Sequence, residues 1–510
     1  MNEFDFPTPT EIESEEALLA QEAYEKYGDR LRDDQVGGRV VRGSMVRVAG
    51  YGIGTLAIAA SSIVLLRYLG VSDFGKYAVV MSLITIVSGI TDAGFNTVGN
   101  RELALTKTHG ERQDILGQLL GIRLVATPIG VLAAIAFTIA ADYESTLILG
   151  TALAGVGATL VACSSAYSMA LAVELRITPL TILETLKQVV PMIAALGLVV
   201  AGATLLPFFA IAIPGAIIAL ALTPRLAGRG SIAGPTFRFR SWGPLLRKAM
   251  PVAISTTIAV IYIRVLTILM FELSSDFETG LFSTSVRVIE MVLTVPWVVF
   301  AIALPVLSVA NSEDRARTAY VFQRMVDVGI VFSTLAALAI CFAADPIIHL
   351  IGGPAYDGAI PVLQIQAFSI IAAFVAQACM YATVAMEMMR ELILANVIGL
   401  IAIVVIGVPM IQAWDAEGAA VAAVFADSIT ALVYIYLVGR IAKEIRPKFN
   451  HAWKPLLAGL LAGGAAYFTP GEAILQTIVA VVVFSAVALI TKAIPSEVFD
   501  AISRKRAQSE

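Results

Sequence analysis

Apolar stretches long enough to cross a membrane recur along almost the whole of this 510-residue chain. We find about fourteen of them, and a transmembrane helix needs about 20 mainly apolar residues. Hydrophobic residues make up 58% of the sequence and charged residues 15%, whereas an average soluble domain has about 25% charged residues. A water-soluble protein of this composition would expose large apolar patches. The sequence therefore predicts an all-α integral membrane protein with about fourteen transmembrane helices, and it excludes a cytosolic enzyme with a single core.

The predicted spans share an apolar centre and are bounded by charged or turn-forming residues. Their approximate limits are 45–68, 73–95, 114–140, 146–171, 178–201, 204–222, 249–272, 279–308, 321–343, 358–384, 391–412, 417–439, 454–469 and 474–492. The loops between these spans are short, which leaves no room for a large extramembrane catalytic domain.

Charged residues are distributed unequally between the two sides of this bundle. If the N-terminus is cytoplasmic, the loops on the other side carry mainly acids, namely Asp142, Glu144, Glu272, Asp276, Glu278, Asp345, Asp357, Asp415, Glu417 and Glu472. The cytoplasmic loops then carry most of the arginine and lysine residues, which is the positive-inside pattern. Arg67 and Lys76 are the main exceptions. We therefore predict a multi-pass protein of the cell membrane with both termini in the cytoplasm.

The chain also shows signs of an internal duplication. Ser72–Tyr77 and Ser275–Phe282 both begin with Ser-Asp-Phe, continue with a glycine, and lie at the outer ends of hairpins six spans apart. Parallel repeats of six spans are a known construction in transporters, with the substrate site between the repeats. We therefore predict two six-helix lobes related by pseudo-twofold symmetry, followed by two extra helices at the C-terminus.

Charge and the repeat together predict the boundaries along the chain. The first 36 residues hold eleven acids and three basic residues and lack the features of a signal peptide. The predicted parts are an acidic cytoplasmic tail at 1–43, an N-terminal six-helix lobe at 44–222, a basic cytoplasmic connection at 223–248, a C-terminal six-helix lobe at 249–440, and two extra helices with a cytoplasmic C-terminus at 441–510.

Catalytic motifs are absent from the sequence. It holds no phosphate loop of the Walker type, no His-Glu-x-x-His zinc motif and no Gly-x-Ser-x-Gly nucleophile turn. Cys163, Cys341 and Cys379 lie in apolar spans, and the three histidines are scattered, so we expect neither a metal site nor a cofactor. A net charge of −4 without a long basic stripe argues against nucleic-acid binding. We therefore expect a protein that is not an enzyme.

Ionisable residues inside the spans carry the strongest functional signal. A charge in lipid is costly, and it usually faces a bundle interior or a wet cavity. The candidate substrate-binding residues are the basic ones, Arg264, Arg123, Lys187 and Arg287. The candidate ion-coupling residues are the acidic ones, Asp92, Glu184, Glu290 and Asp427.

Four of these candidates form two pairs by their spacing. Glu184 and Lys187 lie three residues apart, as do Arg287 and Glu290, so each pair shares one helix face. Such a pair either forms a mutual ion pair that makes burial tolerable or takes part in function. The sequence leaves both readings open.

Arg123 and Arg264 have no carboxylate three or four residues away. Each therefore needs a partner on another helix, water or an anionic ligand, and Arg123 could also extend to the membrane interface along its aliphatic stem. The first span, 45–68, holds no Asp or Glu, whereas a transporter of cationic drugs usually needs a buried carboxylate. A cavity with several unpaired basic groups suits an anion such as a diphosphate, because guanidinium binds phosphate oxygens in pairs.

Short motifs resemble those of a known family. Leu69–Tyr77, followed by Asp92–Phe95 and Asn100–Glu102, resembles the first hairpin of bacterial and archaeal polysaccharide flippases of the O-antigen type. Leu350–Tyr356, with Ala359 and Leu363 after it, resembles the loop before the tenth span in that family. The family belongs with MATE exporters and the lipid II flippase in one superfamily. The acidic tail is longer than the family usually has, and no binding residue is carried over from the family.

The resemblance implies alternating-access translocation of a polyprenyl-diphosphate-linked oligosaccharide across the membrane, for the assembly of cell-surface polysaccharide. The partners it implies are the lipid-linked oligosaccharide, membrane lipids and polysaccharide-assembly proteins. The alternative is a MATE-like cation or drug antiporter, with Asp92, Glu184 or Asp427 as proton or sodium sites. A third hypothesis, a membrane polymerase or ligase acting on lipid-linked sugars, conflicts with the short outer loops.

Overall fold

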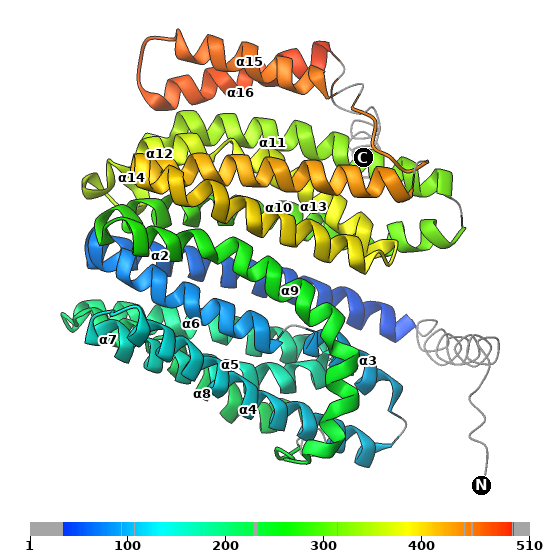
Figure 1. The fold of residues 1–510 in the computed structure, drawn as a ribbon. Coiled ribbons are helices and arrows are strands. Elements are labelled where there is room, and N and C mark those ends of the chain that lie inside the picture. Colours follow the sequence, from blue (N-terminus) through cyan, green and yellow to red (C-terminus); the bar gives the residue numbers. More distant parts are fainter. Residues whose placement is uncertain are drawn as a thin grey trace.

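The computed structural model describes residues 34–493, except 93, 107, 175, 228–232, 314, 443, 450–451 and 492. Most of the predicted acidic tail, part of the basic connection and the end of the chain lie outside the described residues. Every regular element in the described part is a helix (Figure 1), as predicted. In chain order the elements are α2 (Asp34–Asp92), α3 (Phe95–Leu105), α4 (His109–Ala140), α5 (Ser145–Val173), α6 (Ile177–Val200), α7 (Leu205–Phe208), α8 (Ala212–Ala227), α9 (Phe239–Leu273), α10 (Asp276–Glu313), α11 (Arg315–Ile351), the 3-10 helix η2 (Pro354–Tyr356), α12 (Ala359–Gln366), α13 (Ser369–Ala385), α14 (Met389–Ile441), α15 (Trp453–Tyr467) and α16 (Ala473–Ile490).

The two longest helices are each broken once and fold back on themselves. α2 has 59 residues, and a straight helix of that length would be about 88 Å long, whereas the hydrocarbon core is about 30 Å thick. Its break is at Gly70, whose φ of 73° suits a residue without a side chain, and its two arms run in opposite directions (Figure 1). α14 breaks at Trp414 and Asp415. Its arms are also antiparallel, because Tyr434 donates a hydrogen bond of 2.9 Å to Asn396.

Ten helices in the described part of the chain are long and apolar enough to cross a membrane, or up to eleven if the bent pair α12 and α13 counts as one span. α2 and α14 each cover two of the predicted spans. The predicted span 454–469 corresponds to α15, which has only 15 residues. The multi-pass membrane class is therefore confirmed, whereas the exact count of fourteen spans is not.

The bundle has two halves, which we call the N-terminal half (α2–α8) and the C-terminal half (α9–α14). They meet mainly where α2 packs against α9 and α10. α15 and α16 lie beside α11 at the far edge of the C-terminal half, where Gly459 contacts Thr334 (Figure 1). The segment 233–238 before α9 runs along α4, and the Thr236 N–H donates to the Gly117 carbonyl over 2.8 Å. The connection between the halves is thus fastened to the N-terminal half.

Several acidic residues predicted to face the outside lie at one end of the bundle, which we call the acidic end, namely Glu144, Glu272, Asp276, Glu278 and Asp415. Lys76 Nζ lies 2.7 Å from a carboxylate oxygen of Glu144 and 3.4 Å from one of Asp276. Lys76 was an exception to the predicted charge pattern, and these two carboxylates explain it. Since Asp276 belongs to the C-terminal half, the same lysine also joins the two halves.

The two predicted repeat motifs meet at the acidic end. Gly75 of α2 lies against the carbonyl of Asp276, and Gly280 of α10 lies against the carbonyl of Val71. A Cβ atom on Gly75 would be 2.2 Å from the Asp276 oxygen, and one on Gly280 would be 2.0 Å from the Val71 oxygen. Only glycine permits this approach. Each hairpin thus places a glycine against a backbone carbonyl of the other hairpin.

Candidate substrate site between the two halves

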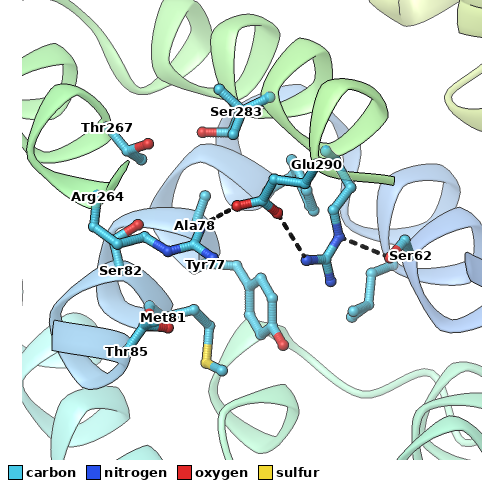
Figure 2. A pocket seen from close by; sticks show the side chains of 14 residues that line it. Ser62, Tyr77, Ala78, Met81, Ser82, Thr85, Arg264, Thr267, Ser283 and Glu290 are labelled. Carbon is cyan, nitrogen blue, oxygen red and sulfur yellow. Dashed lines mark hydrogen bonds and ion pairs between the residues drawn. The ribbon is translucent and has the colours of Figure 1, made fainter. Parts of the chain in front are cut away.

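A cavity of about 120 Å³ lies between the two halves (Figure 2). Both arms of α2 line one side of it, and α9 and α10 line the other. Its polar lining consists of Ser62, Ser82, Thr85, Arg264, Thr267, Ser283, Arg287 and Glu290. Its remaining lining consists of Leu65, Phe74, Tyr77, Ala78, Met81 and Val286.

Three charged side chains meet in this cavity. Arg264 Nη1 lies 2.8 Å from Glu290 Oε1, and Arg287 Nη1 lies 3.5 Å from Glu290 Oε2 (Figure 2). Arg287 Nε also donates to Ser62 Oγ over 2.9 Å, which ties α10 to the first arm of α2. Two guanidinium groups and one carboxylate leave the group with a formal excess of positive charge.

Two buried polar atoms of the cavity lining have no hydrogen-bond partner among the described residues. They are the Oγ atom of Ser283, a residue only 7% exposed, and the Nε atom of Arg264. Buried polar groups in proteins are normally hydrogen-bonded. A polar ligand that reaches the cavity therefore gains a hydroxyl group and a guanidinium N–H as partners.

Helical spacing explains why these side chains share a wall. On α10, Ser283, Arg287 and Glu290 follow one another at intervals of four and three residues, which places them on one face. On α9, Arg264 and Thr267 are three residues apart. The sequence prediction included the charges of this wall but missed its hydroxyl groups, although Ser283 lies one turn before Arg287 on the same face.

The other predicted basic residues lie in the N-terminal half and do not line this cavity. Arg123 is fully buried, with its guanidinium 2.9 Å from Asp92 and 2.6 Å from the carbonyl of Ala162. Lys187 lies 2.7 Å from Glu184 on the same helix, α6. Of the partners left open for Arg123, which were a group on another helix, water or an anionic ligand, the structure shows the first, Asp92 of α2.

The expectation of unpaired basic groups is wrong. Each of the four candidates has a carboxylate within 3.5 Å, as is seen for Arg264, Arg123, Lys187 and Arg287. The physical reason is that an uncompensated charge inside the bundle would lose its hydration without replacement.

Asp427 lies apart from both groups of charges. It faces α9 and α13, accepts a short hydrogen bond from Tyr262, and is also bonded by Ser369. Both hydrogen bonds come from hydroxyl groups, so Asp427 has no basic partner among these contacts. A carboxylate held in this way is suited to bind a proton or a small cation.

Further polar contacts join the halves at the acidic end. Tyr143 donates to Glu272 over 2.5 Å. Burial raises the pKa of Tyr143, so its hydroxyl stays protonated at neutral pH. Arg67 donates to the carbonyl of Leu350 over 2.9 Å, near the C-terminus of α11, where a cation is favourable. This contact explains the second exception to the predicted charge pattern.

Comparison of the sequence with known proteins identifies one family. The sequence profile of a family described as polysaccharide biosynthesis protein matches residues 64–361. No curated protein sequence matches significantly.

Several solved structures are similar in fold. The lipid II flippase MurJ in an inward closed conformation is 12% identical with a TM-score of 0.69, and the match covers 88% of this chain and 98% of that one. An inward-facing multidrug resistance MATE family transporter of the MOP superfamily is 11% identical with a TM-score of 0.66, covering 78% and 98%. A MOP superfamily transporter from Pyrococcus furiosus, described as having a binding pocket of reverse polarity, is 12% identical with a TM-score of 0.58, covering 79% and 94%. At these identities the likeness shows the fold, which is that of MurJ and the MATE transporters.

Proposed function

This chain belongs to the polysaccharide biosynthesis protein family, and on that premise we propose that it translocates a polyprenyl-diphosphate-linked oligosaccharide across the cell membrane by alternating access. The transported lipid serves the assembly of cell-surface polysaccharide. The observation that carries the proposal is the cavity between the halves, in which Arg264 and Arg287 converge from two different helices.

The chemistry of the cavity suits a diphosphate. Guanidinium groups bind phosphate oxygens through paired, directional hydrogen bonds, and Arg264 and Arg287 present two such groups. Ser62 and Ser283 add hydroxyl groups to the same lining. With a volume of about 120 Å³, the cavity is smaller than typical ligand pockets of about 300–1,000 Å³. It can take the charged group, and the halves must separate to admit the sugars.

The closed acidic end supports a transport cycle in which the two halves rock against each other. The glycine contact, the Lys76 bridge and the Tyr143–Glu272 hydrogen bond all join the halves at that end. In this proposal the acidic end faces the outside of the cell and both termini are cytoplasmic. These contacts part when the ligand leaves on the outer side, where polysaccharide-assembly proteins receive it.

Four predicted residues keep a place in the proposal outside the cavity. Arg123 and Lys187 stay predicted substrate contacts, and Asp92 and Glu184 stay predicted ion-coupling residues. Neutral substitutions test these assignments, because a substrate or coupling residue changes the rate of translocation per molecule of folded protein.

A leaflet assay tests the proposed function. Purified protein is placed in liposomes with a fluorescent polyprenyl-diphosphate sugar, and protection of the fluorophore from an external quencher is followed. Arg264→Gln should slow the movement by about tenfold or more, because a hydrogen bond to a charged group contributes about 1.5–3 kcal/mol. Arg390→Gln is the matched control, since Arg390 is exposed and does not line the cavity. Folded protein that moves no diphosphate-linked sugar, or full activity in Arg264→Gln, would contradict the proposal.

A MATE-like cation or drug antiporter is the second candidate, and Asp427 favours it. Its hydroxyl partners Tyr262 and Ser369 would suit the exchange of a proton or sodium ion. If this alternative holds, overexpression confers drug resistance that Asp427→Asn abolishes. Drug export by protein that moves no lipid-linked sugar would establish it in place of the flippase.

A further inference from the structure

Glu290 occupies the position in which an anionic ligand would meet both arginines. Its two carboxylate oxygens are divided between them, with Oε1 at 2.8 Å from Arg264 and Oε2 at 3.5 Å from Arg287. The oxygens of a phosphate group likewise accept charge-assisted hydrogen bonds from arginine. Glu290 is also the acidic residue of the cavity lining. Within about 120 Å³, a bound phosphate and this carboxylate compete for the same donors.

We propose that Glu290 is an internal counter-ion, which the ligand's phosphate displaces, and that the displaced carboxylate then takes up a proton. Binding of the substrate is thereby coupled to binding of a proton. This inference rests on the proposed function, because it assumes an anionic ligand at Arg264 and Arg287.

The charges of the loaded cavity explain the proton. Two guanidinium groups carry two positive charges, and a diphosphate diester carries two negative ones. An ionised Glu290 would add an uncompensated negative charge beside the phosphates, and like charges in a confined site favour protonation of one of them. The proton comes from hydronium on the side to which the cavity opens, and it forms an O–H bond to one carboxylate oxygen of Glu290. The loaded cavity is then neutral, which is the form most easily buried.

The groups that face Glu290 are consistent with this coupling. Arg264 is the charged group from α9, and Arg287 is the charged group from α10 itself. α2 contributes the phenol of Tyr77 and the hydroxyl of Ser62. Glu290 contributes a carboxylate to the cavity lining. When a phosphate displaces this carboxylate, Glu290 loses both of its basic partners, Arg264 and Arg287.

Calorimetry of ligand binding tests the proposal. Protein in lipid nanodiscs is titrated with farnesyl-diphosphoryl-N-acetylglucosamine, a diphosphate diester, in buffers of different ionisation enthalpy. The dependence of the heat on the buffer gives the number of protons taken up. We expect close to one proton for each ligand bound, and an affinity that falls by up to about tenfold for each pH unit as the pH rises. Glu290→Gln should bind without proton uptake and with an affinity that no longer depends on pH.

The control is Asp327→Asn. Asp327 lies in a span, on α11, is bonded by Gln323 over 2.8 Å, and does not line the cavity. This variant should take up the same number of protons as the wild type. Equal proton uptake in Asp327→Asn and in the wild type shows that removing a carboxylate elsewhere in the bundle does not abolish the coupling.

The outcomes separate the inference from the function on which it rests. If the wild type binds the probe without proton uptake, the inference is overturned and the proposed function still stands. The same holds if Glu290→Gln takes up as many protons as the wild type. Wild-type protein that does not bind the probe, or binding that is insensitive to Arg264→Gln, overturns the proposed function and the inference with it. The wild-type proton count decides the matter even if Glu290→Gln does not fold.

Discussion

The glycine contact at the acidic end predicts how the two halves respond to a single added methyl group. Replacing Gly280 with alanine places a Cβ atom 2.0 Å from the carbonyl oxygen of Val71. Neither atom can move away by side-chain rotation, so the helices must separate by about 1 Å to reach a tolerable 3.0 Å. Overpacking of this kind costs about 1–3 kcal/mol. The equilibrium should therefore shift by about 5- to 150-fold towards a state in which the acidic end is open.

Thiol labelling measures this shift. A cysteine replaces Ala78 in the cavity lining, the three native cysteines are removed, and a membrane-impermeant maleimide is added on the face that carries the acidic loops. Gly280→Ala should raise the labelling rate by the factor above. Gly52→Ala is the matched control, because an added Cβ there meets nothing within 4 Å. An unchanged rate in folded Gly280→Ala protein would refute the reasoning.

Three other contacts predict effects on opening of the acidic end, on attachment of the connection 233–238 and on stability. Lys76→Met should raise the same labelling rate by less than about fivefold, because the carboxylate partners of Lys76 are exposed to solvent and exposed ion pairs contribute about 0.2–1 kcal/mol. A larger rise than in Gly280→Ala would contradict this ranking. Gly121→Leu should detach the connection 233–238 from α4, since even a Cβ there would lie 2.3 Å from the Thr236 oxygen, and limited proteolysis should then cut the connection faster than in the wild type. Arg123→Met should lower the free energy of unfolding by about 3–5 kcal/mol, because Asp92 loses its ion-pair partner, and adding Asp92→Asn should restore part of it. A double variant as unstable as the single one would contradict the assigned ion pair.

The helical class and most helix positions could be predicted from apolar length and charge. The predicted spans 45–68 and 73–95 bracket the break at Gly70, and 391–412 and 417–439 bracket the break at Trp414 and Asp415. The exact count of fourteen spans is not confirmed, because two elements depart from a straight apolar run. α15 ends after 15 residues, and α12 and α13 are bent by 41°. Such features depend on packing against neighbouring helices, which hydropathy does not encode.

The site was predictable only in part. The cost of charge in lipid identified Arg264, Arg287 and Glu290 as residues that face the interior. Spacing within one helix predicted Glu290 as the partner of Arg287, whereas its shorter contact, at 2.8 Å, is with Arg264 of α9. Pairing across helices depends on how α9 packs beside α10, and the spacing of residues along the chain does not predict that packing. The separation of Arg123 from this cavity has the same origin.

A structure of the protein with a bound polyprenyl-diphosphate disaccharide tests the central claim most directly. We predict phosphate oxygens within hydrogen-bond distance of both Arg264 and Arg287, with the Glu290 carboxylate turned away from them. Phosphates bound instead beside Arg123 and Lys187, with the contact between Arg264 and Glu290 intact, would contradict the assignment of the cavity as the substrate site.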